Sequence, residues 1–436
     1  IYPPPAYLST CLFTYSLPTP MKHDLNRLMA ERNLAAAVVR GSTLESPAIH
    51  YLTGGHKLEA VTILLRPGQR PVLVHNPMER DEAALTGMET ALSTRWNARQ
   101  IAQEMNGDLL AAQAEQLRRI LVDYGVHGRV GFYGHGEIGQ AHALLNRLAQ
   151  VLDDTEVVVE YSDDLLTSAR ITKDTTEIAA MREVADRANQ VVIALVDMLT
   201  SRPVSGSARS STAYLLAPNG EALTVGAVKR FIHEQCMAQG LEQPGGNIFS
   251  LGADAGVPHN QGNPNDVLTL GTPIIFDFFP RPVGGGYYHD MTRTWCLGFA
   301  PQPVQRAYQD TMDVFKLVME TLESGRRAAT YQSVTCKFFE ALSYPTILST
   351  PGTQVGYVHS LGHGLGLEIH EAPSFYGADS NPARLQPGSV FTVEPGLYFP
   401  EEGYGVRIED VVYCDDAGLF HSLTPFPKDL VLPVQQ

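Results

Sequence analysis

Apolar and polar positions follow two different arrangements along this chain. In the first third, short apolar runs alternate with stretches of helical spacing, which predicts strands and helices in alternation. The predicted elements are a helix at 23–32, strands at 35–40, 61–65, 72–75, 130–133 and 156–160, an apolar segment at 49–52, and helical stretches at 98–124 and 138–151. This pattern indicates an α/β domain whose mixed sheet is flanked by helices.

A second pattern follows a boundary near residue 166. Asp174-Thr-Thr-Glu177 is a capping box, and apolar residues then recur at helical spacing as far as Leu199, which predicts a long helix. Further helices are predicted at 225–239, 302–324 and 331–343, with strands at 246–251, 273–279, 293–298, 390–394 and 405–413. This part is predicted to be α+β, with helices covering a curved antiparallel sheet. The expected divisions are 1–21, 22–165 and 166–436.

Composition narrows the classes of function. The net charge of −15 over 436 residues leaves no basic surface for nucleic acid, and no apolar run reaches the ~18 residues of a membrane span. The five cysteines are scattered, as expected for free thiols in a reducing, cytoplasmic compartment. We expect neither a nucleic-acid nor a membrane partner. Residues 1–21 are expected to be an arm or an appended segment, with a structured segment as the alternative.

Three acidic residues interrupt apolar, strand-like runs in the last third of the chain: Asp277, Glu394 and Glu409. A buried carboxylate is costly unless a positive charge meets it. Asp290 follows Asp277 across a glycine-rich turn, and a hairpin would bring both acids to one end. Four carboxylates balance the charge of two divalent cations, which indicates a two-metal hydrolytic site. For Asp290 taken alone, a helix cap or turn is the alternative.

Histidines are the second component of this candidate site. Three of them fall in one glycine-rich run: His359, His363 and His370. We expect one imidazole to ligate metal and the others to move protons or hold substrate, the alternative being structural histidines. For His259 both possibilities stay open. Arg407 shares a strand face with Glu409, where it would hold a ligand acid or form a purely structural ion pair.

The chain resembles the pita-bread metallopeptidases, which include aminopeptidase P, prolidase, methionine aminopeptidase and the non-metal relative creatinase. The resemblance lies in ordered motifs: Pro258-His259, Asp277, Asp290-Met-Thr-Arg-Thr294, His359-x3-His363-x6-His370-Glu, Glu394-Pro-Gly and Arg407-Ile-Glu409. Tyr51-Leu-Thr-Gly54 is similar to a segment of the N-terminal domain of aminopeptidase P and prolidase. The resemblance implies an α/β creatinase-like domain at 22–165 and an α+β pita-bread catalytic domain at 166–436.

The resemblance also implies residue roles. Five residues would ligate two divalent ions, most simply Mn, with Co, Zn, Fe or Mg as alternatives: Asp277, Asp290, His363, Glu394 and Glu409. Asp290 and Glu409 would bridge the ions, and Glu394 would orient or deprotonate the bridging water. The remaining catalytic candidates hold substrate, transfer protons or line the pocket: His259, His370, His359 and Arg407. Two departures from the family are the long loop between Asp277 and Asp290 and Phe279, which stands where the family often has glycine; Arg281 and the glycine run of this loop are expected to reshape the pocket entrance.

The resemblance implies the activity of a metallo-aminopeptidase or dipeptidase, which hydrolyses the X–Pro bond of a proline-containing peptide through a metal-bridging hydroxide. It also implies that the protein is a homodimer. One alternative is the same dimetal site acting on a non-peptide small molecule, such as a compatible-solute amide or an organophosphate. The other is a binding module that keeps the fold without turnover.

Overall fold

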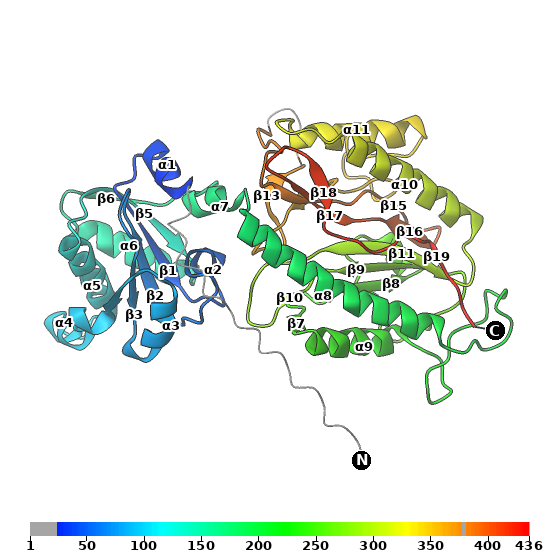
Figure 1. The fold of residues 1–436 in the computed structure, drawn as a ribbon, viewed down its shortest axis with the longest axis horizontal. Helices are drawn as coiled ribbons and strands as arrows, with labels where there is room; N and C mark the ends of the chain where they lie inside the picture. Colours follow the sequence, from blue (N-terminus) through cyan, green and yellow to red (C-terminus); the bar gives the residue numbers. More distant parts are fainter. Residues whose placement is uncertain (1–23, 162, 377–380, 436) are drawn as a thin grey trace, which may run out of the picture. The chain divides into compact units, whose positions relative to one another are not determined.

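The chain forms two compact units, which separate between Ala169 and Arg170 (Figure 1). The computed structural model describes residues 24–161, 163–376 and 381–435. The arm predicted at 1–21 lies outside these residues. Within the described ranges, no helix has both the length and the apolar character needed to cross a membrane.

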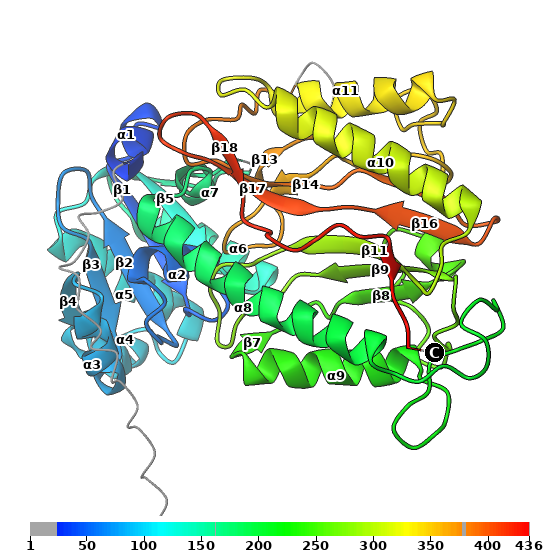
Figure 2. The ribbon, with the colours of Figure 1, turned by 45° about the vertical axis from the view of Figure 1, so that its right-hand side comes forward.

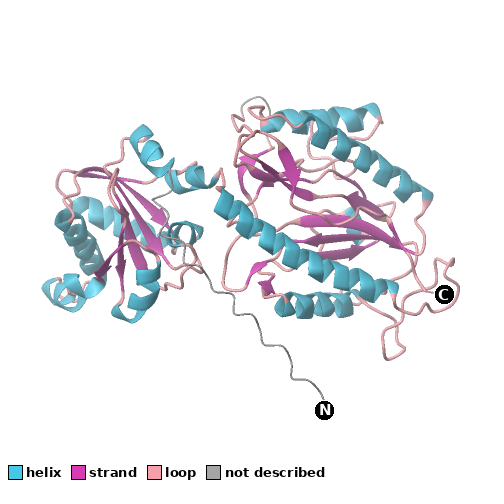
Figure 3. Ribbon diagram, in the orientation of Figure 1, coloured by secondary structure: helices cyan, strands magenta, loops and turns pink. Residues whose placement is uncertain are grey.

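A six-stranded mixed sheet forms the centre of the first unit (Figure 3). Its strand order is β4-β3-β2-β1-β5-β6, with β1 antiparallel to β2 and parallel to β5. The strands are β1 (Ala36–Gly41), β2 (Val61–Leu65), β3 (Val72–His75), β4 (Glu89–Leu92), β5 (Gly128–Gly134) and β6 (Thr155–Val158). The helices are α1 (Asp24–Glu31), α2 (Pro47–Thr53), α3 (Arg80–Leu85), α4 (Ala98–Glu104), α5 (Leu109–Asp123) and α6 (Ile138–Val151), and α7 (Leu165–Arg170) follows β6.

Local sequence features set where two helices of this unit, α4 and α2, end and begin. The stretch predicted as helical at 98–124 is divided, because Asn106 and Gly107 adopt left-handed φ values of 51° and 83° and end α4. The apolar segment at 49–52 lies in α2, which Ser46 caps and Pro47 begins. Apolar side chains of α4, α5 and α6 pack against the sheet and form the core of this unit.

Among its described residues, the second unit contains the remaining strands and four α-helices. The strands are β7 (Leu241–Glu242), β8 (Ile248–Leu251), β9 (Pro273–Phe278), β10 (Arg281–Pro282), β11 (Met291–Leu297), β12 (His363–Gly364), β13 (Glu371–Ser374), β14 (Val390–Val393), β15 (Gly396–Phe399), β16 (Tyr404–Arg407), β17 (Asp410–Cys414), β18 (Phe420–Ser422) and β19 (Val431–Leu432). The helices are α8 (Thr175–Thr200), α9 (Val225–Ala238), α10 (Gln302–Thr321) and α11 (Ala328–Ala341). The predicted capping box is confirmed at the start of α8.

The strands of this unit form two main sheets, ordered β19-β11-β9-β8 and β13-β12-β14-β17-β18, together with the β15–β16 hairpin. Helices α8 and α9 pack against the first sheet, and helices α10 and α11 pack against the second sheet and the β15–β16 hairpin. The strands therefore lie between the two pairs of helices (Figure 2). The sheets meet where Thr292 bridges Glu409. An α+β unit thus follows the α/β unit, as the sequence predicts.

The prediction of a single strand at 405–413 is wrong. This segment is divided into β16 and β17, and Glu409 lies between them. Glu394 likewise falls just after β14 rather than inside the strand predicted at 390–394. Of the three acids in apolar runs, Asp277 alone lies within a strand.

Candidate metal centre

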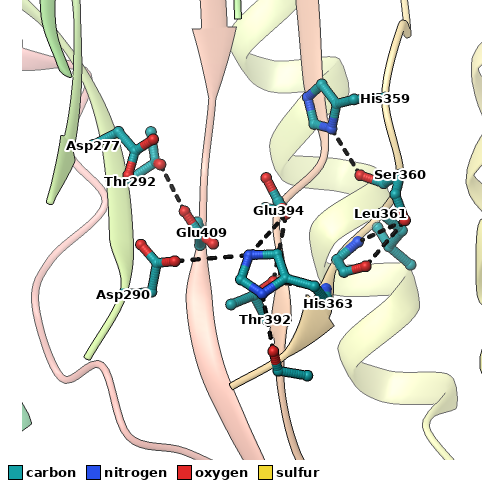
Figure 4. Close-up of polar contacts among 12 residues, drawn as sticks. Asp277, Asp290, Thr292, His359, Ser360, Leu361, His363, Thr392, Glu394 and Glu409 are labelled. Atoms are coloured by element: carbon teal, nitrogen blue, oxygen red, sulfur yellow. Dashed lines mark hydrogen bonds and ion pairs between the residues drawn. The ribbon is translucent and has the colours of Figure 1, made fainter. Parts of the chain in front are cut away.

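Five separate backbone segments direct the predicted ligands toward one place (Figure 4). Asp277 lies in β9, and Asp290 directly precedes β11, its antiparallel neighbour. His363 begins β12, while Glu394 follows β14 and Glu409 precedes β17. The hairpin predicted from the glycine-rich turn therefore forms, and the two sheets together carry the four acids and the imidazole.

Asp290, His363 and Glu409 form the tightest part of this group, with one potential ligand atom from each lying within 4.8 Å of the others. The His363 Nε2 atom lies 3.7 Å from Asp290 Oδ2 and 3.5 Å from Glu394 Oε1. Its Nδ1 atom lies 3.1 Å from the carbonyl oxygen of Gly364, which can only accept, so Nδ1 carries the proton. The Nε2 lone pair is therefore left facing the acids, as metal ligation requires.

The donor set fits divalent metal. Among the described residues, Asp290 Oδ1 and Glu409 Oε1 are buried oxygens without a hydrogen-bond partner. Burial, reinforced by Glu409, raises the pKa of Asp290 well above its usual range, and burial with Asp277 nearby raises the pKa of Glu409 to about 8. Such carboxylates are ionised at neutral pH only with positive charge beside them. Cations bound here would satisfy the unpartnered oxygens and balance the acids.

Arg407 holds the fifth predicted ligand. Its Nη2 atom donates to Asp277 Oδ2, so this carboxylate faces a guanidinium and is not part of the tight group. Arg407 Nη1 donates to the Tyr398 hydroxyl at 2.8 Å, and that hydroxyl donates to His359 Nε2 at 2.9 Å. A continuous chain of hydrogen bonds thus connects His359 with Asp277 through two buried side chains.

The three predicted histidines other than His363 fall into two classes. His359 uses both ring nitrogens within the protein, Nδ1 donating to Ser360 O at 2.7 Å and Nε2 accepting from Tyr398. Burial, with Arg407 nearby, lowers the pKa of His359 to about 3, so it stays neutral. His259 and His370 are exposed. This arrangement holds the His359 ring through both of its nitrogens and leaves His259 and His370 available to a bound molecule.

All nine predicted site residues line one cavity of about 420 Å³. Apolar side chains, namely Ile248, Phe279, Ile369 and Tyr376, complete the wall beside them. Phe279, which stands where the family often has glycine, is thus part of the lining, whereas Arg281 and the glycines of its loop are not among the described lining residues. The cavity combines a dense group of ionisable side chains with an apolar surface, as small-molecule and peptide sites do.

Thr292 and Thr392 were missed by the sequence reasoning. Thr292 Oγ1 donates to Glu409 Oε2 at 2.7 Å and accepts from Arg407 Nε at 3.0 Å. The Thr392 hydroxyl lies 3.4 Å from Glu394 Oε1. Each threonine lies two positions from an acid of the site. Because side chains alternate between the two faces of a strand, this spacing could have indicated that each threonine faces the same side as its acid.

Glycines on both sides of His363 allow two strands to approach it closely. A Cβ atom at Gly362 would lie 2.0 Å from the carbonyl oxygen of Thr392, and one at Gly364 would lie 2.1 Å from that of Ala372. Both distances are far shorter than any van der Waals contact. Side chains are therefore excluded at these two positions, and the imidazole is fixed between the strands.

Comparison with known proteins assigns the chain to a family. Residues 179–416, more than half of the chain, match the family model of metallopeptidase family M24. The Xaa-Pro dipeptidase of Pyrococcus furiosus is 27% identical over 260 residues, 59% of this chain and 64% of that protein. The uncharacterized peptidase YqhT of Bacillus subtilis is 33% identical over 185 residues, 42% of this chain and 48% of that protein. The matched part thus spans about half to two thirds of these relatives' lengths.

Solved structures extend the likeness in fold to nearly the whole chain. The Xaa-Pro dipeptidase from Bacillus anthracis has a TM-score of 0.71 at 19% identity, covering 94% of this chain and 99% of that one. The X-Pro aminopeptidase from Thermotoga maritima has a TM-score of 0.69 at 19% identity, with the same coverage of 94% and 99%. The fold is therefore that of the two-domain, creatinase-like plus pita-bread proteins. The chain belongs to metallopeptidase family M24.

Proposed function

We propose that this protein is a metal-dependent exopeptidase that hydrolyses the bond between a first residue and proline. The observation that carries the proposal is the convergence of Asp290, His363 and Glu409, with two buried unpartnered oxygens, in a cavity that also presents exposed histidines. The named activities of the relatives support the same choice.

Metal would be held by the acids and by His363 Nε2. Oxygen-rich ligation with one imidazole suits Mn, and Co, Zn, Fe or Mg are compatible with it. The four carboxylates match two divalent ions in charge, which favours a two-metal site. When bound, the ions would polarise the scissile carbonyl group and make water a stronger nucleophile. Thr292 and Arg407 would hold the ligand acids Glu409 and Asp277 in orientation.

Glu394 is the base in this proposal. Its Oε1 atom lies 3.5 Å from His363 Nε2, and burial, with Glu409 nearby, raises its pKa well above the usual range. Because this carboxylate lies beside the ligand group, Glu394 is placed to take the proton of the attacking water. His259 and His370, which open into the cavity, hold the substrate carbonyl group and deliver a proton to the leaving nitrogen.

The apolar wall supports proline beyond the scissile bond. The nitrogen of an X–Pro bond carries no hydrogen, so the site cannot recognise it through an N–H donor. Burial of the pyrrolidine ring is the remaining source of recognition. Ile248, Phe279 and Ile369 line the cavity and offer such a surface.

Reconstitution with Mn, Co or Zn, followed by peptide hydrolysis assays, tests this function. We expect cleavage before proline in Ala-Pro-amide or Ala-Pro-Ala and none in Ala-Ala-Ala. Glu394→Gln should reduce kcat by at least about 100-fold, as loss of a general base does. Glu401→Gln is the matched control, because Glu401 is an exposed glutamate on the turn between β15 and β16 and is not among the described residues that line the cavity. Turnover of an organophosphate or a non-peptide amide with no X–Pro cleavage would refute the proposal.

A further inference from the structure

A buried glutamine on helix α11 contacts the backbone that carries two histidines of the site. Gln332 is 3% exposed, and its helix neighbours Tyr331, Cys336 and Phe339 belong to an apolar core of the second unit. Among the described residues that line the cavity, none comes from α11. Burying an amide is costly unless its polar atoms form hydrogen bonds, so the partners of Gln332 indicate what this residue does.

Three residues of the segment 357–361 contact this amide. The Gln332 Oε1 atom accepts from the backbone N–H of Leu361 at 2.6 Å and from the Tyr357 hydroxyl at 3.1 Å. A backbone N–H can only donate, so the atom facing Leu361 is the oxygen of the amide, which fixes its orientation. The Nε2 atom then faces the carbonyl oxygen of His359 at 3.4 Å. A single side chain of α11 thus holds this segment at three points.

Leu361 connects this amide with Glu394. Its carbonyl oxygen accepts from the backbone N–H of Glu394 at 2.7 Å, and its side chain is fully buried. Ser360 and Gly362, on either side of Leu361 in the chain, line the cavity. Both polar backbone groups of Leu361 are therefore used, the N–H toward α11 and the carbonyl group toward Glu394, which lies on the neighbouring segment in Figure 4.

The side-chain contacts of Glu394 are longer than those of another acid of the site. Glu409 Oε2 accepts from Thr292 Oγ1 at 2.7 Å. Glu394 Oε1, by contrast, lies 3.4 Å from the Thr392 hydroxyl and 3.5 Å from His363 Nε2. Because neither contact is short enough to fix the carboxylate, its position depends chiefly on the backbone of Glu394, whose N–H is bonded to Leu361.

We propose that Gln332 is a positioning residue for the hydrolytic reaction, which fixes the place of Glu394 through Leu361 and contacts neither metal nor substrate. The inference rests on the proposed function and adds to it a residue behind the cavity wall. Without the amide, the buried N–H of Leu361 would lack its acceptor, and a backbone shift that brings it to a new one would move Glu394 as well. A misplacement of about 1 Å is enough to lower a rate about 100-fold.

Gln332→Met tests the inference in the full-length, Mn²⁺-loaded protein, because methionine has a similar length and no amide. Tyr331→Phe is the matched control, since the Tyr331 hydroxyl accepts from the backbone N–H of Glu323 at 2.8 Å, on the segment that joins α10 and α11. Each substitution removes the acceptor of one backbone N–H, so both variants should unfold at a lower urea concentration than the wild type. With Ala-Pro-Ala as substrate, kcat should fall about 10–100-fold in Gln332→Met, with KM changed less than about threefold, and stay within about twofold in Tyr331→Phe.

Mn²⁺ binding provides a second readout, which needs no turnover. Glu394 is a metal ligand in the proposed function, so calorimetry should show an affinity about 10–100-fold weaker in Gln332→Met and within about twofold of the wild type in Tyr331→Phe. Gln332→Asn stays polar but is too short to reach Leu361, so it should show the same losses as Gln332→Met. It serves as the test if the methionine variant does not fold.

Unchanged kcat and Mn²⁺ affinity in the two Gln332 variants, with stability lowered, would make the residue purely structural and overturn the inference. Equal losses in Tyr331→Phe would overturn it as well, because destabilisation alone would then account for them. If the wild type cleaves no X–Pro bond, the proposed function fails, whereas weaker Mn²⁺ binding confined to the Gln332 variants would still support the positioning of Glu394.

Discussion

Arg293 provides a sharp test of what stabilises the second unit. It is fully buried in β11 and donates to four backbone carbonyl oxygens as well as to Asp410 Oδ1. Two of these carbonyl groups belong to Thr292 and Glu409, where the two sheets meet. Arg293→Met keeps most of the side-chain volume and removes all of these donors, which isolates the polar contribution.

The expected loss of unfolding free energy is about 3–5 kcal/mol, the range for removing one partner of a buried ion pair. Lys428 Nζ stays 2.7 Å from Asp410 Oδ2 and limits the penalty on that carboxylate, but the four carbonyl oxygens lose their donor. The control is Arg326→Met, because the pair of Arg326 with Glu323 is exposed and is expected to contribute under about 1 kcal/mol.

Urea unfolding measured by tryptophan fluorescence is a suitable assay. The chain has two tryptophans, and Trp295 lies in β11 whereas Trp96 lies in the first unit. A Trp96→Phe background therefore reports on the second unit alone, which avoids mixing two transitions. An Arg293→Met effect no larger than that of Arg326→Met would refute the reasoning, and so would an unchanged midpoint.

Three further predictions concern the site and its surroundings. Thr292→Val, an isosteric change that removes the hydrogen bond to Glu409, should weaken Mn²⁺ binding about 10–100-fold in calorimetry with the fold intact; unchanged affinity would contradict it. Lys173→Met should lower the unfolding free energy by about 3 kcal/mol, because Glu371 stays buried without this partner. Adding Glu371→Gln should restore part of the lost free energy, and effects of the two substitutions that simply add up would contradict the pairing. Burial raises the pKa of Cys296 to about 12, so mass mapping should find it unalkylated in native protein from pH 7 to 10 and alkylated in urea.

Local signals explain why much of the fold could be predicted. The capping box at Asp174 places the start of α8, and the glycine-rich turn after Asp277 correctly indicates a hairpin. In both cases the deciding contacts lie within a short stretch of sequence. The Asn106-Gly107 break was equally local, since this pair favours left-handed backbone, but the apolar periodicity on both sides obscured it.

Long-range pairing explains what could not be predicted. The division of the strand at 405–413 depends on Glu409 bridging to Thr292, more than a hundred residues earlier. The hydrogen bond between His359 and Tyr398 likewise joins residues 39 positions apart, and no sequence pattern indicates that they are partners. Residue type and order could indicate which side chains line the common cavity, whereas the partner of each side chain depends on how the two sheets meet.

Positions in and around the cavity differ in how well they tolerate substitution. Gly362 and Gly364 face backbone oxygens at distances that no side chain can accept, so a substitution there moves strands of the sheet. Gln261 and Tyr376 line the same cavity and are exposed, so a substitution there alters the wall alone. Substrate range can therefore diversify by single mutations in the wall while the reactive centre stays constant, which makes this scaffold a favourable starting point for laboratory evolution.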